Sequence, residues 1–483
     1  MSLKIVLYVL GRLSWAYGCG MLLPLFVSVW YHESCTSSFA LAVVICMAWG
    51  KGLMSYGTVP AGEVTNREGI AITALGWIMV MFLGAVPYMA GGYLSVLDSV
   101  FECISGLSGT GATAIPDLEI MPQGILLWRS LTHWFGGLGI IVIFIALFPQ
   151  LGRGTVHMFN AESTGPTSDR NVPRIKEMAK ALFFVYLTFT VAATLACMAC
   201  GMSALMALNH ACSTIATGGF SPYNASVAHF NSPLIEGVLA FFMIISSANF
   251  GMYVAAWKRG PNVILSNTEF RVYIGLVVAA SVMMAADLVA EQGWPWNEAF
   301  RQAFFQAASI SSSTGFVSSD FDTWPAFSRI ILLFFMFVGG CAGSTAGGLK
   351  VTRLILLIKT IALRIRQKMH PHLVFHVRCN KETFSEDILY GVARFFFVYV
   401  MLDILWTLLF IFDGIPIFDA LGVAVSTMGS CGPGFGLFGA TCTYAEMPVF
   451  SKTVVCLSML MGRLEIFPVL ALLMPSFWKR RVW

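Results

Sequence analysis

Four short clusters of Ser, Thr and Gly recur along the chain, each after a short apolar segment. Each cluster centres on a polar residue followed by glycine, and these pairs are Thr110-Gly111, Thr217-Gly218, Thr314-Gly315 and Cys431-Gly432. Glycine adopts positive φ at no steric cost, so successive carbonyl oxygens can point the same way. When several such loops converge on one axis, their carbonyl oxygens can replace the hydration shell of a cation. The clusters therefore predict a lined path for a cation.

The elements that must position these clusters repeat with them. Each unit is a long apolar helix, a shorter apolar segment, the cluster and a second long apolar helix. The expected ranges are 68–92, 97–108 and 126–150, then 176–201, 205–215 and 233–257, then 269–290, 297–311 and 327–366, and finally 388–412, 416–427 and 449–476. The shorter segments cannot span about 30 Å of hydrocarbon, so they are expected to be re-entrant. An isolated Thr-Gly pair would be an ordinary helix end, and the fourfold recurrence favours a pore.

Composition agrees with a chain that lies in the membrane. Hydrophobic residues make up 57% of it and charged residues 11%, against about 25% charged in a soluble domain. Two further apolar stretches, 5–31 and 38–58, precede the first unit. We therefore predict an all-α polytopic membrane protein with four tandem helix-pore loop-helix units around a pseudo-fourfold pore, plus two extra N-terminal transmembrane helices. The expected divisions are 1–66, 67–152, 153–262, 263–380 and 381–483.

Basic residues are unevenly distributed between the two sets of connections. The segments 32–37, 93–125, 202–232 and 413–448 contain no Lys or Arg. The opposite set contains Lys51, Arg67, Arg153, Arg170, Arg174, Lys176, Lys180, Lys258, Arg259, a cluster from Arg364 to Lys381, and Lys479 to Arg481. By the positive-inside rule this second set faces the cytoplasm, with both termini. The basic runs are then topology signals, and a nucleic-acid partner is not expected.

Acidic residues gather on the side that lacks Lys and Arg. They can raise the local cation concentration at a pore mouth, and ordinary solvated loop carboxylates are an equally good interpretation. The residues concerned are Asp98, Glu102, Asp117, Glu119, Glu298, Asp320, Asp322, Asp413, Asp419 and Glu446.

A glycine-rich run from Gly339 to Lys350 interrupts the second helix of the third unit. Each glycine inside a helix costs about 0.5 to 1 kcal/mol relative to alanine, so the helix is expected to break here. No strand precedes the run, which disfavours a phosphate-binding loop, and close helix packing through small residues is the alternative. Arg463 is expected near mid-membrane, where an ion is a functional candidate. It would pair with Glu465 or with carbonyl oxygens of the glycine-rich run.

Two polar residues lie on the helix expected at 126–150. Arg129 is expected near the outer boundary with its charge directed to water. His133 is equally compatible with packing and with function. The cysteines show no paired metal-ligand spacing, and the single CxxC at Cys197 and Cys200 favours packing.

The chain resembles the TrkH/TrkG potassium-uptake subunits, of the superfamily that includes KtrB and the plant and fungal Trk/HKT transporters. The resemblance covers essentially the whole chain, and the two leading helices are similar to TrkH/TrkG rather than to KtrB. It is carried by residues 108–113, 213–221, 311–316, 339–350, 432–434 and 462–467. In the fourth loop, Ser430-Cys431 replaces the Asn-Leu expected from the family.

The resemblance implies a selectivity filter around Gly111, Gly218, Gly315 and Gly432. In related plant transporters a serine at the first of these positions goes with sodium preference, and because this chain has Gly111 there, the resemblance favours potassium. The resemblance also implies a gate below the filter, with Arg463 as a positive barrier. The gate residues are Gly339, Gly340, Gly343, Ser344, Thr345, Ala346, Gly347, Gly348 and Lys350.

The resemblance implies partners as well. These are a second copy in a homodimer, membrane lipid, and a TrkA-like cytoplasmic subunit that binds the regulatory nucleotide. The basic stretch 364–378, with His370, His372 and His376, is expected to dock that subunit, and metal or anionic lipid binding there are the alternatives. Potassium is then the transported ion, no nucleotide binds this chain, and the location is the bacterial inner membrane.

A proton- or sodium-coupled secondary potassium symporter is the main alternative. Such folds often use inverted repeats, whereas the four units here run in the same direction, which favours a fixed filter. An enzyme is disfavoured because HExxH and GxSxG motifs are absent. The residues leave channel-like and coupled transport open.

Overall fold

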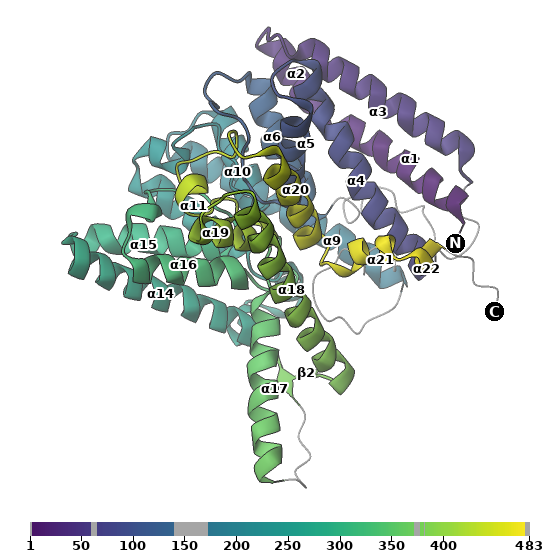
Figure 1. The fold of residues 1–483 in the computed structure, drawn as a ribbon. Helices are drawn as coiled ribbons and strands as arrows, with labels where there is room; N and C mark the ends of the chain where they lie inside the picture. Colours follow the sequence, from purple (N-terminus) through teal and green to yellow (C-terminus); the bar gives the residue numbers. More distant parts are fainter. Residues whose placement is uncertain (1, 59–64, 140–171, 371–376, 381, 479–483) are drawn as a thin grey trace.

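The computed structural model describes residues 2–58, 65–139, 172–370, 377–380 and 382–478 (Figure 1).

The N-terminal part of the chain is a pair of packed apolar spans, the first made of two consecutive helices. α1 (Leu3–Gly20) continues into α2 (Leu22–Trp30), and α3 (Thr36–Tyr56) packs back along α1. Side chains at Gly11 or Gly50 would clash with the backbone of the other helix. Small residues thus let the two backbones approach closely, as is common between membrane helices.

Six long apolar spans agree with the prediction. They are the α1–α2 span, α3, and the first helix of every unit: α4 (Asn66–Ala90), α9 (Val172–Ala199), α14 (Thr268–Gln292) and α18 (Glu386–Phe412). In the described residues these are the helices long and apolar enough to cross a membrane unbent. Their length and uninterrupted apolar composition explain why the sequence predicts them well.

The four short segments form helices that end at the clusters. They are α5 (Val96–Ser108), α10 (Ala204–Ile215), α15 (Trp296–Ser311) and α19 (Ile417–Met428). With 12 to 16 residues each and a rise of about 1.5 Å per residue, they are shorter than the hydrocarbon core. The prediction of four half-helices is therefore confirmed.

The second helices of the units are broken, and here the prediction was partly wrong. The predicted continuous helix 233–257 is α11 (Pro233–Ser246) and α12 (Phe250–Arg259), which meet at 86°. The predicted helix 449–476 is α20 (Val449–Arg463) and α21 (Phe467–Leu473), which meet at 117°. Only the break between α16 (Ala326–Val338) and α17 (Val351–Met369) was expected.

The local geometry at the two unexpected breaks shows how each helix ends or begins there. Asn249 starts α12 by accepting a hydrogen bond from the Gly251 N–H at 2.8 Å, which is an N-cap that favours a new helix. Glu465 and Ile466 have positive φ of 52° and 65°, which residues inside a right-handed helix do not adopt, so α20 ends before them. α6 (Gln123–Leu138) covers the start of the predicted helix 126–150, whose remainder from residue 140 lies outside the described residues.

Short elements complete the described chain. α13 (Asn262–Ser266) and α22 (Pro475–Trp478) are helices, and η2 (Ser226–Phe230), η3 (Phe321–Thr323) and η4 (Gly436–Phe438) are 3₁₀ turns. β1 (Arg378–Cys379) and β2 (Glu382–Thr383) form an antiparallel pair, with Arg378 opposite Thr383. This pair is a small departure from the predicted all-α fold.

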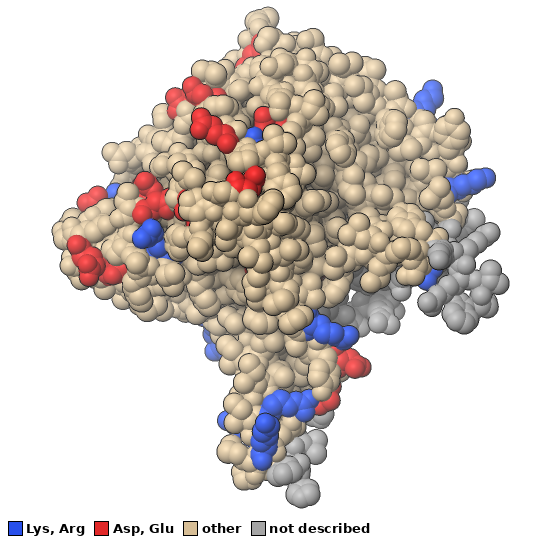
Figure 2. Space-filling model, viewed as in Figure 1, with Lys and Arg blue, Asp and Glu red and all other residues tan. Residues whose placement is uncertain are grey.

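α17 projects away from the body of the molecule (Figure 1). Figure 2 shows Lys and Arg side chains on this projection and most Asp and Glu side chains on the opposite part of the visible face. Several residues used in the sequence analysis, Arg153, Arg170, His372, His376 and Lys479 to Arg481, lie outside the described residues.

Candidate functional site

The four clusters meet in a closed ring, each touching the next in chain order. A side chain added at the ring glycine of one cluster would clash with a carbonyl oxygen of the following cluster. The pairs are Gly111 with Gly218, Gly219 with Thr314, Gly315 with Cys431, and Gly432 with Thr110. The fourth cluster thus closes on the first.

Backbone angles fix the correspondence between the clusters. The ring glycines have φ of 82° (Gly111), 81° (Gly219), 78° (Gly315) and 93° (Gly432). The residue two places earlier also has positive φ in every cluster, at Gly109, Thr217, Ser313 and Ser430. Gly219, rather than the predicted Gly218, therefore matches the other three glycines. The predicted Thr217 correspondingly lies one place earlier than Thr110, Thr314 and Cys431.

Two adjacent glycines explain this difference in register. Both are needed: Gly219 for its positive φ, and Gly218 because a side chain there would collide with the ring of His133. A serine lies six residues before every ring glycine, at Ser105, Ser213, Ser309 and Ser426. That repeated spacing is a sequence signal that would have selected Gly219.

The same serines hold the clusters to their half-helices. Their carbonyl oxygens accept hydrogen bonds from the N–H groups of Thr110, Gly218, Thr314 and Cys431, at 3.0, 2.8, 2.8 and 2.8 Å. These bonds satisfy carbonyl groups that the end of a helix would otherwise leave unpaired. All four half-helices therefore end in the same way, including the one that carries Cys431.

A cavity of about 210 Å³ lies against the ring and is lined by all four ring glycines. Tyr444 forms part of the cavity wall. Its hydroxyl donates to the Gly432 carbonyl at 2.9 Å, and its N–H donates to the Thr113 carbonyl at 2.8 Å. Among its described lining residues the charged one is Arg129. The predicted outer carboxylates do not line it.

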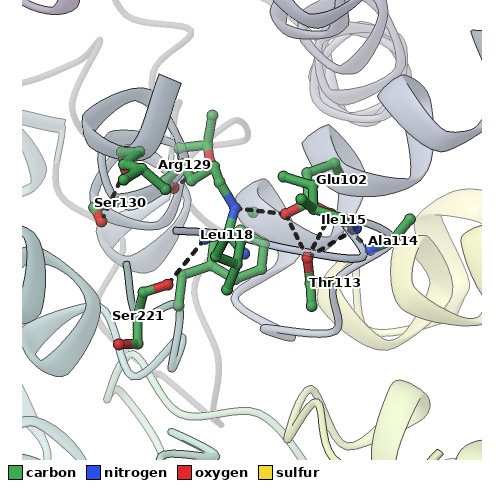
Figure 3. Close-up of polar contacts among 12 residues, drawn as sticks. Glu102, Thr113, Ala114, Ile115, Leu118, Arg129, Ser130 and Ser221 are labelled. Atoms are coloured by element: carbon green, nitrogen blue, oxygen red, sulfur yellow. Dashed lines mark hydrogen bonds and ion pairs between the residues drawn. The ribbon is translucent and has the colours of Figure 1, made fainter. Parts of the chain in front are cut away.

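Glu102 and Arg129 form a buried ion pair behind the first cluster (Figure 3). Glu102 Oε1 lies 2.6 Å from Arg129 Nε, and the side chains are 0% and 1% exposed. Glu102 also accepts from the Ala114 N–H at 2.9 Å, and Arg129 Nη1 donates to the Ser221 carbonyl at 3.0 Å. The predictions of a solvated Glu102 and an Arg129 directed to water were therefore wrong. The pair instead links the first cluster to the second.

His133 packs between the same two clusters. Its Nδ1 lies 2.7 Å from the Gly106 carbonyl, and its Nε2 accepts from the Phe220 N–H at 3.2 Å. One nitrogen accepts and the other faces a carbonyl oxygen, so the ring is neutral with its proton on Nδ1. His133 therefore positions backbone, which agrees with the packing alternative.

All predicted gate residues other than Arg463 lie in one stretch between α16 and α17, residues 339–350, here called the glycine-rich connection. Gly339, Gly343 and Gly348 have φ of 68°, 70° and 77°. A side chain at Gly347 would clash with the Gly429 carbonyl just before the fourth cluster. The connection thus packs against the ring from the end where the half-helices terminate.

Thr345 joins the connection to the second unit. Its hydroxyl lies 3.1 Å from the Ile215 carbonyl, 3.2 Å from the Ser246 carbonyl and 3.2 Å from the Thr217 hydroxyl. Ser344 instead donates to the Cys341 carbonyl at 2.6 Å, within the connection itself.

Further hydrogen bonds join the connection to the break between α11 and α12 and to Glu269 of α14. The Cys341 N–H donates to the Ser247 carbonyl at 2.9 Å, and the Phe250 N–H donates to the Gly343 carbonyl at 3.0 Å. Glu269 accepts from the N–H groups of Ala342 and Thr352 at 2.7 and 3.1 Å. The break between α11 and α12 therefore exists where it can pair with the connection.

Arg463 ends α20 beside the connection. It donates to the carbonyl oxygens of Thr345 at 3.1 Å and Gly137 at 2.8 Å, and also to that of Gly136. One carbonyl oxygen of the connection, that of Thr345, is thus among its partners, as one alternative from the sequence predicted. Glu465 forms an ion pair with Arg353 at 2.6 Å. The buried Lys350 donates to the Ala346 carbonyl.

The fold and the site define an all-helical, multi-span membrane protein with bent, re-entrant helices around a ring of glycine loops. The model of the TrkH family, described as a cation transport protein, matches residues 36–480. The chain therefore belongs to the TrkH family, which confirms the resemblance found in its motifs and places it among transport proteins rather than enzymes.

Several named relatives match this chain over nearly its full length. The Trk system potassium uptake protein TrkH of Salmonella typhimurium is 36% identical over 489 residues, covering 99% of this chain and 100% of the relative. The Trk system potassium uptake protein TrkG of Escherichia coli is 29% identical over 481 residues, 99% of each. The crystal structure of the potassium transporter TrkH from Vibrio parahaemolyticus superposes with a TM-score of 0.89 at 33% identity, covering 99% of this chain and 100% of that one.

Proposed function

We propose that this chain takes up potassium across the bacterial inner membrane through a selectivity filter formed by the four clusters. The observation that carries the proposal is the closed ring, in which a positive-φ glycine of each unit lies against a carbonyl oxygen of the next. Such a ring supplies backbone carbonyl oxygens from four directions, the chemistry that replaces the hydration of a potassium ion. The names of the full-length relatives support potassium as the ion.

The carbonyl positions of this filter are Thr110, Gly218, Thr314 and Cys431, with Gly111, Gly219, Gly315 and Gly432 following them. In this proposal the four units, 67–152, 153–262, 263–380 and 381–483, surround one pseudo-fourfold pore. The segment 1–66, with its two extra transmembrane helices, precedes them in the chain. Both termini would face the cytoplasm, because the basic residues gather on that side.

The glycine-rich connection and Arg463 act as the gate in this proposal. The connection packs against the ring through Gly347 and is fixed to the second unit by Thr345. A positive guanidinium beside it opposes the passage of a cation. α17 follows the connection directly, so a cytoplasmic partner bound to its projecting basic end can move the gate. A TrkA-like nucleotide-binding subunit is the partner proposed, and a homodimer the assembly.

Potassium and sodium flux into proteoliposomes of the purified chain tests the function. Potassium flux that exceeds sodium flux, and that continues without an imposed proton gradient, is expected for a filter and gate. Flux that stops when the proton gradient is removed would instead support the proton-coupled symporter. Equal potassium and sodium flux would contradict the filter assignment.

A further inference from the structure

Glu269 in the first turn of α14 binds two separate parts of the chain beside the ring. The residue is 3% exposed, and its Oε1 accepts hydrogen bonds from the N–H groups of Ala342 at 2.7 Å and Thr352 at 3.1 Å. Ala342 lies in the glycine-rich connection, and Thr352 lies in the first turn of α17. One carboxylate oxygen therefore holds the connection and the helix that follows it together.

α17 depends on this carboxylate for its N-terminal cap. The first N–H groups of a helix have no partner within the helix. Among the described residues, the N-cap residue Lys350 provides no side-chain cap, and the first turn of α17 contains no Asp or Glu. A carboxylate is favoured at this end, because the N-terminus of a helix carries a partial positive charge. Glu269 supplies the carboxylate from 83 residues earlier in the chain.

The two ends of the glycine-rich connection are also bonded directly to each other. Three N–H groups at or just before the start of α17 donate to carbonyl oxygens at or just after the end of α16. The pairs are Leu349 with Phe337 at 3.1 Å, Lys350 with Val338 at 2.8 Å, and Val351 with Gly340 at 2.9 Å. Ala342 and Thr352 follow the last of these pairs, and Glu269 bridges them. α17 therefore cannot move away from Ala342 without breaking a bond to Glu269.

The first turn of α14 is fixed from another side by the short strands. The Thr268 N–H donates to Asn380 Oδ1 at 2.7 Å, and Asn380 lies in the turn between β1 and β2. Lys359 of α17 donates to the Arg378 carbonyl of β1 at 2.7 Å. The β1–β2 pair therefore joins the start of α14 to the projecting part of α17. A displacement of α17 is thus resisted at Lys359 as well as at Thr352.

We propose that Glu269 is a positioning residue of the gate, which holds the glycine-rich connection against the ring. This role rests on the proposed function, because the gate that Glu269 positions is the gate of that function. Ion flux requires the connection to leave the path. When α17 is displaced, either the bond from Thr352 breaks or Ala342 moves with the helix. Without the carboxylate, fewer bonds hold the connection, and it leaves the ring more often.

Thiol labelling of the full chain in lipid vesicles tests this hold without a measurement of transport. Cys341 is next to Ala342 in the connection and is 1% exposed. Its rate of reaction with N-ethylmaleimide, located by mass spectrometry, reports how often the connection opens locally. Cys103 of α5 is 0% exposed and reports in the same way on the rest of the fold.

Two variants of similar shape separate hydrogen bonding from charge. Glu269→Met has no oxygen to accept the two bonds, Glu269→Gln keeps one, and both variants remove the negative charge. We expect Cys341 to react severalfold faster in Glu269→Met than in Glu269→Gln, with Cys103 protected in both. Glu291→Ala is the control and should react at the wild-type rate, because Glu291 is exposed near the other end of α14. Equal Cys341 rates in the Met and Gln variants, or labelling of Cys103 in either, would overturn the proposal.

Potassium flux into proteoliposomes tests the consequence for the gate. Flux is expected to be lowest in the wild type, and severalfold higher in Glu269→Met than in Glu269→Gln. Equal flux in the two variants would overturn the role of Glu269 in the gate. If the wild type carries no potassium flux at all, the proposed function fails, and the labelling of Cys341 still decides whether Glu269 holds the connection.

Discussion

The carbonyl oxygen of Thr345 lies 3.1 Å from Nη1 of Arg463, and this hydrogen bond joins the glycine-rich connection to the end of α20. The same guanidinium binds the Gly136 and Gly137 carbonyls at the end of α6. One side chain therefore fastens the connection between the first and fourth units. It combines two effects, a positive charge next to the ring and a mechanical tie.

Removing this side chain should open the path. Arg463→Ala eliminates both the charge and the tie to Thr345, so potassium flux into proteoliposomes is expected to rise severalfold or selectivity to loosen. Arg394→Ala is the matched control, because Arg394 is exposed and donates to the Tyr390 carbonyl of its own helix. Unchanged flux and selectivity in Arg463→Ala would contradict a barrier role.

The hydroxyl of Thr345 offers a test of the mechanical tie alone. Thr345→Val keeps the size of the side chain and removes its hydrogen bonds to the second unit. A lost hydrogen bond costs about 0.5 to 1.5 kcal/mol, so the open fraction of the gate should rise up to about tenfold. Ser344→Ala is the control, because its hydroxyl bonds within the connection. Equal flux increases in both variants would show that the tie to the second unit is unimportant.

The sequence predicted elements whose signal is local. The long spans and the half-helices were correct because length and apolar composition suffice to define them. The break between α11 and α12 was not predicted, because it depends on bonds from Ser247 and Phe250 to a segment about ninety residues away. The glycine-rich connection, in contrast, was found because its glycines themselves break the helix.

Errors at the site also came from tertiary contacts. Glu102 and Arg129 are 27 residues apart and come from different helices, so each appeared as an isolated charge. The choice between Gly218 and Gly219 depended on His133, whose ring occupies the space beside Gly218. Only the repeated serine six residues before each ring glycine carried the register in the sequence itself.

Equivalent substitutions at two ring glycines test the register. Gly219→Ser and Gly315→Ser both place a side chain at positive φ and against a neighbouring carbonyl oxygen. We expect both to reduce the ratio of potassium to sodium flux. Gly275→Ser in α14 should leave the ratio unchanged, because nothing lies within 4 Å of a Cβ there. A normal ratio in Gly219→Ser would return the filter position to Gly218, and a normal ratio in Gly315→Ser would remove the third cluster from the filter.

The buried ion pair should matter for stability. Glu102→Ala leaves the guanidinium of Arg129 buried without its counter-charge, which is expected to cost about 3 to 5 kcal/mol. The midpoint of thermal unfolding of the purified chain in detergent should fall accordingly. Glu386→Ala breaks the exposed pair with Arg364, whose side chain is 46% exposed, and should cost less than about 1 kcal/mol. Similar midpoints for the two variants would show that burial gives the Glu102 pair no special role.

Tyr444 offers a test of the fourth cluster, where Ser430-Cys431 replaces the Asn-Leu that the resemblance implied. Tyr444→Phe removes only the hydroxyl that donates to the Gly432 carbonyl and leaves the backbone bond to Thr113 in place. The Gly432 carbonyl should then be less firmly held by about 0.5 to 1.5 kcal/mol, and the ratio of potassium to sodium flux should fall with little change in thermal stability. Tyr253→Phe is the control, because it removes a hydroxyl of the same kind that donates to Ile245 at 2.8 Å, away from the ring. If the two variants lower the ratio equally, or Tyr444→Phe leaves it unchanged, Tyr444 does not position the fourth cluster.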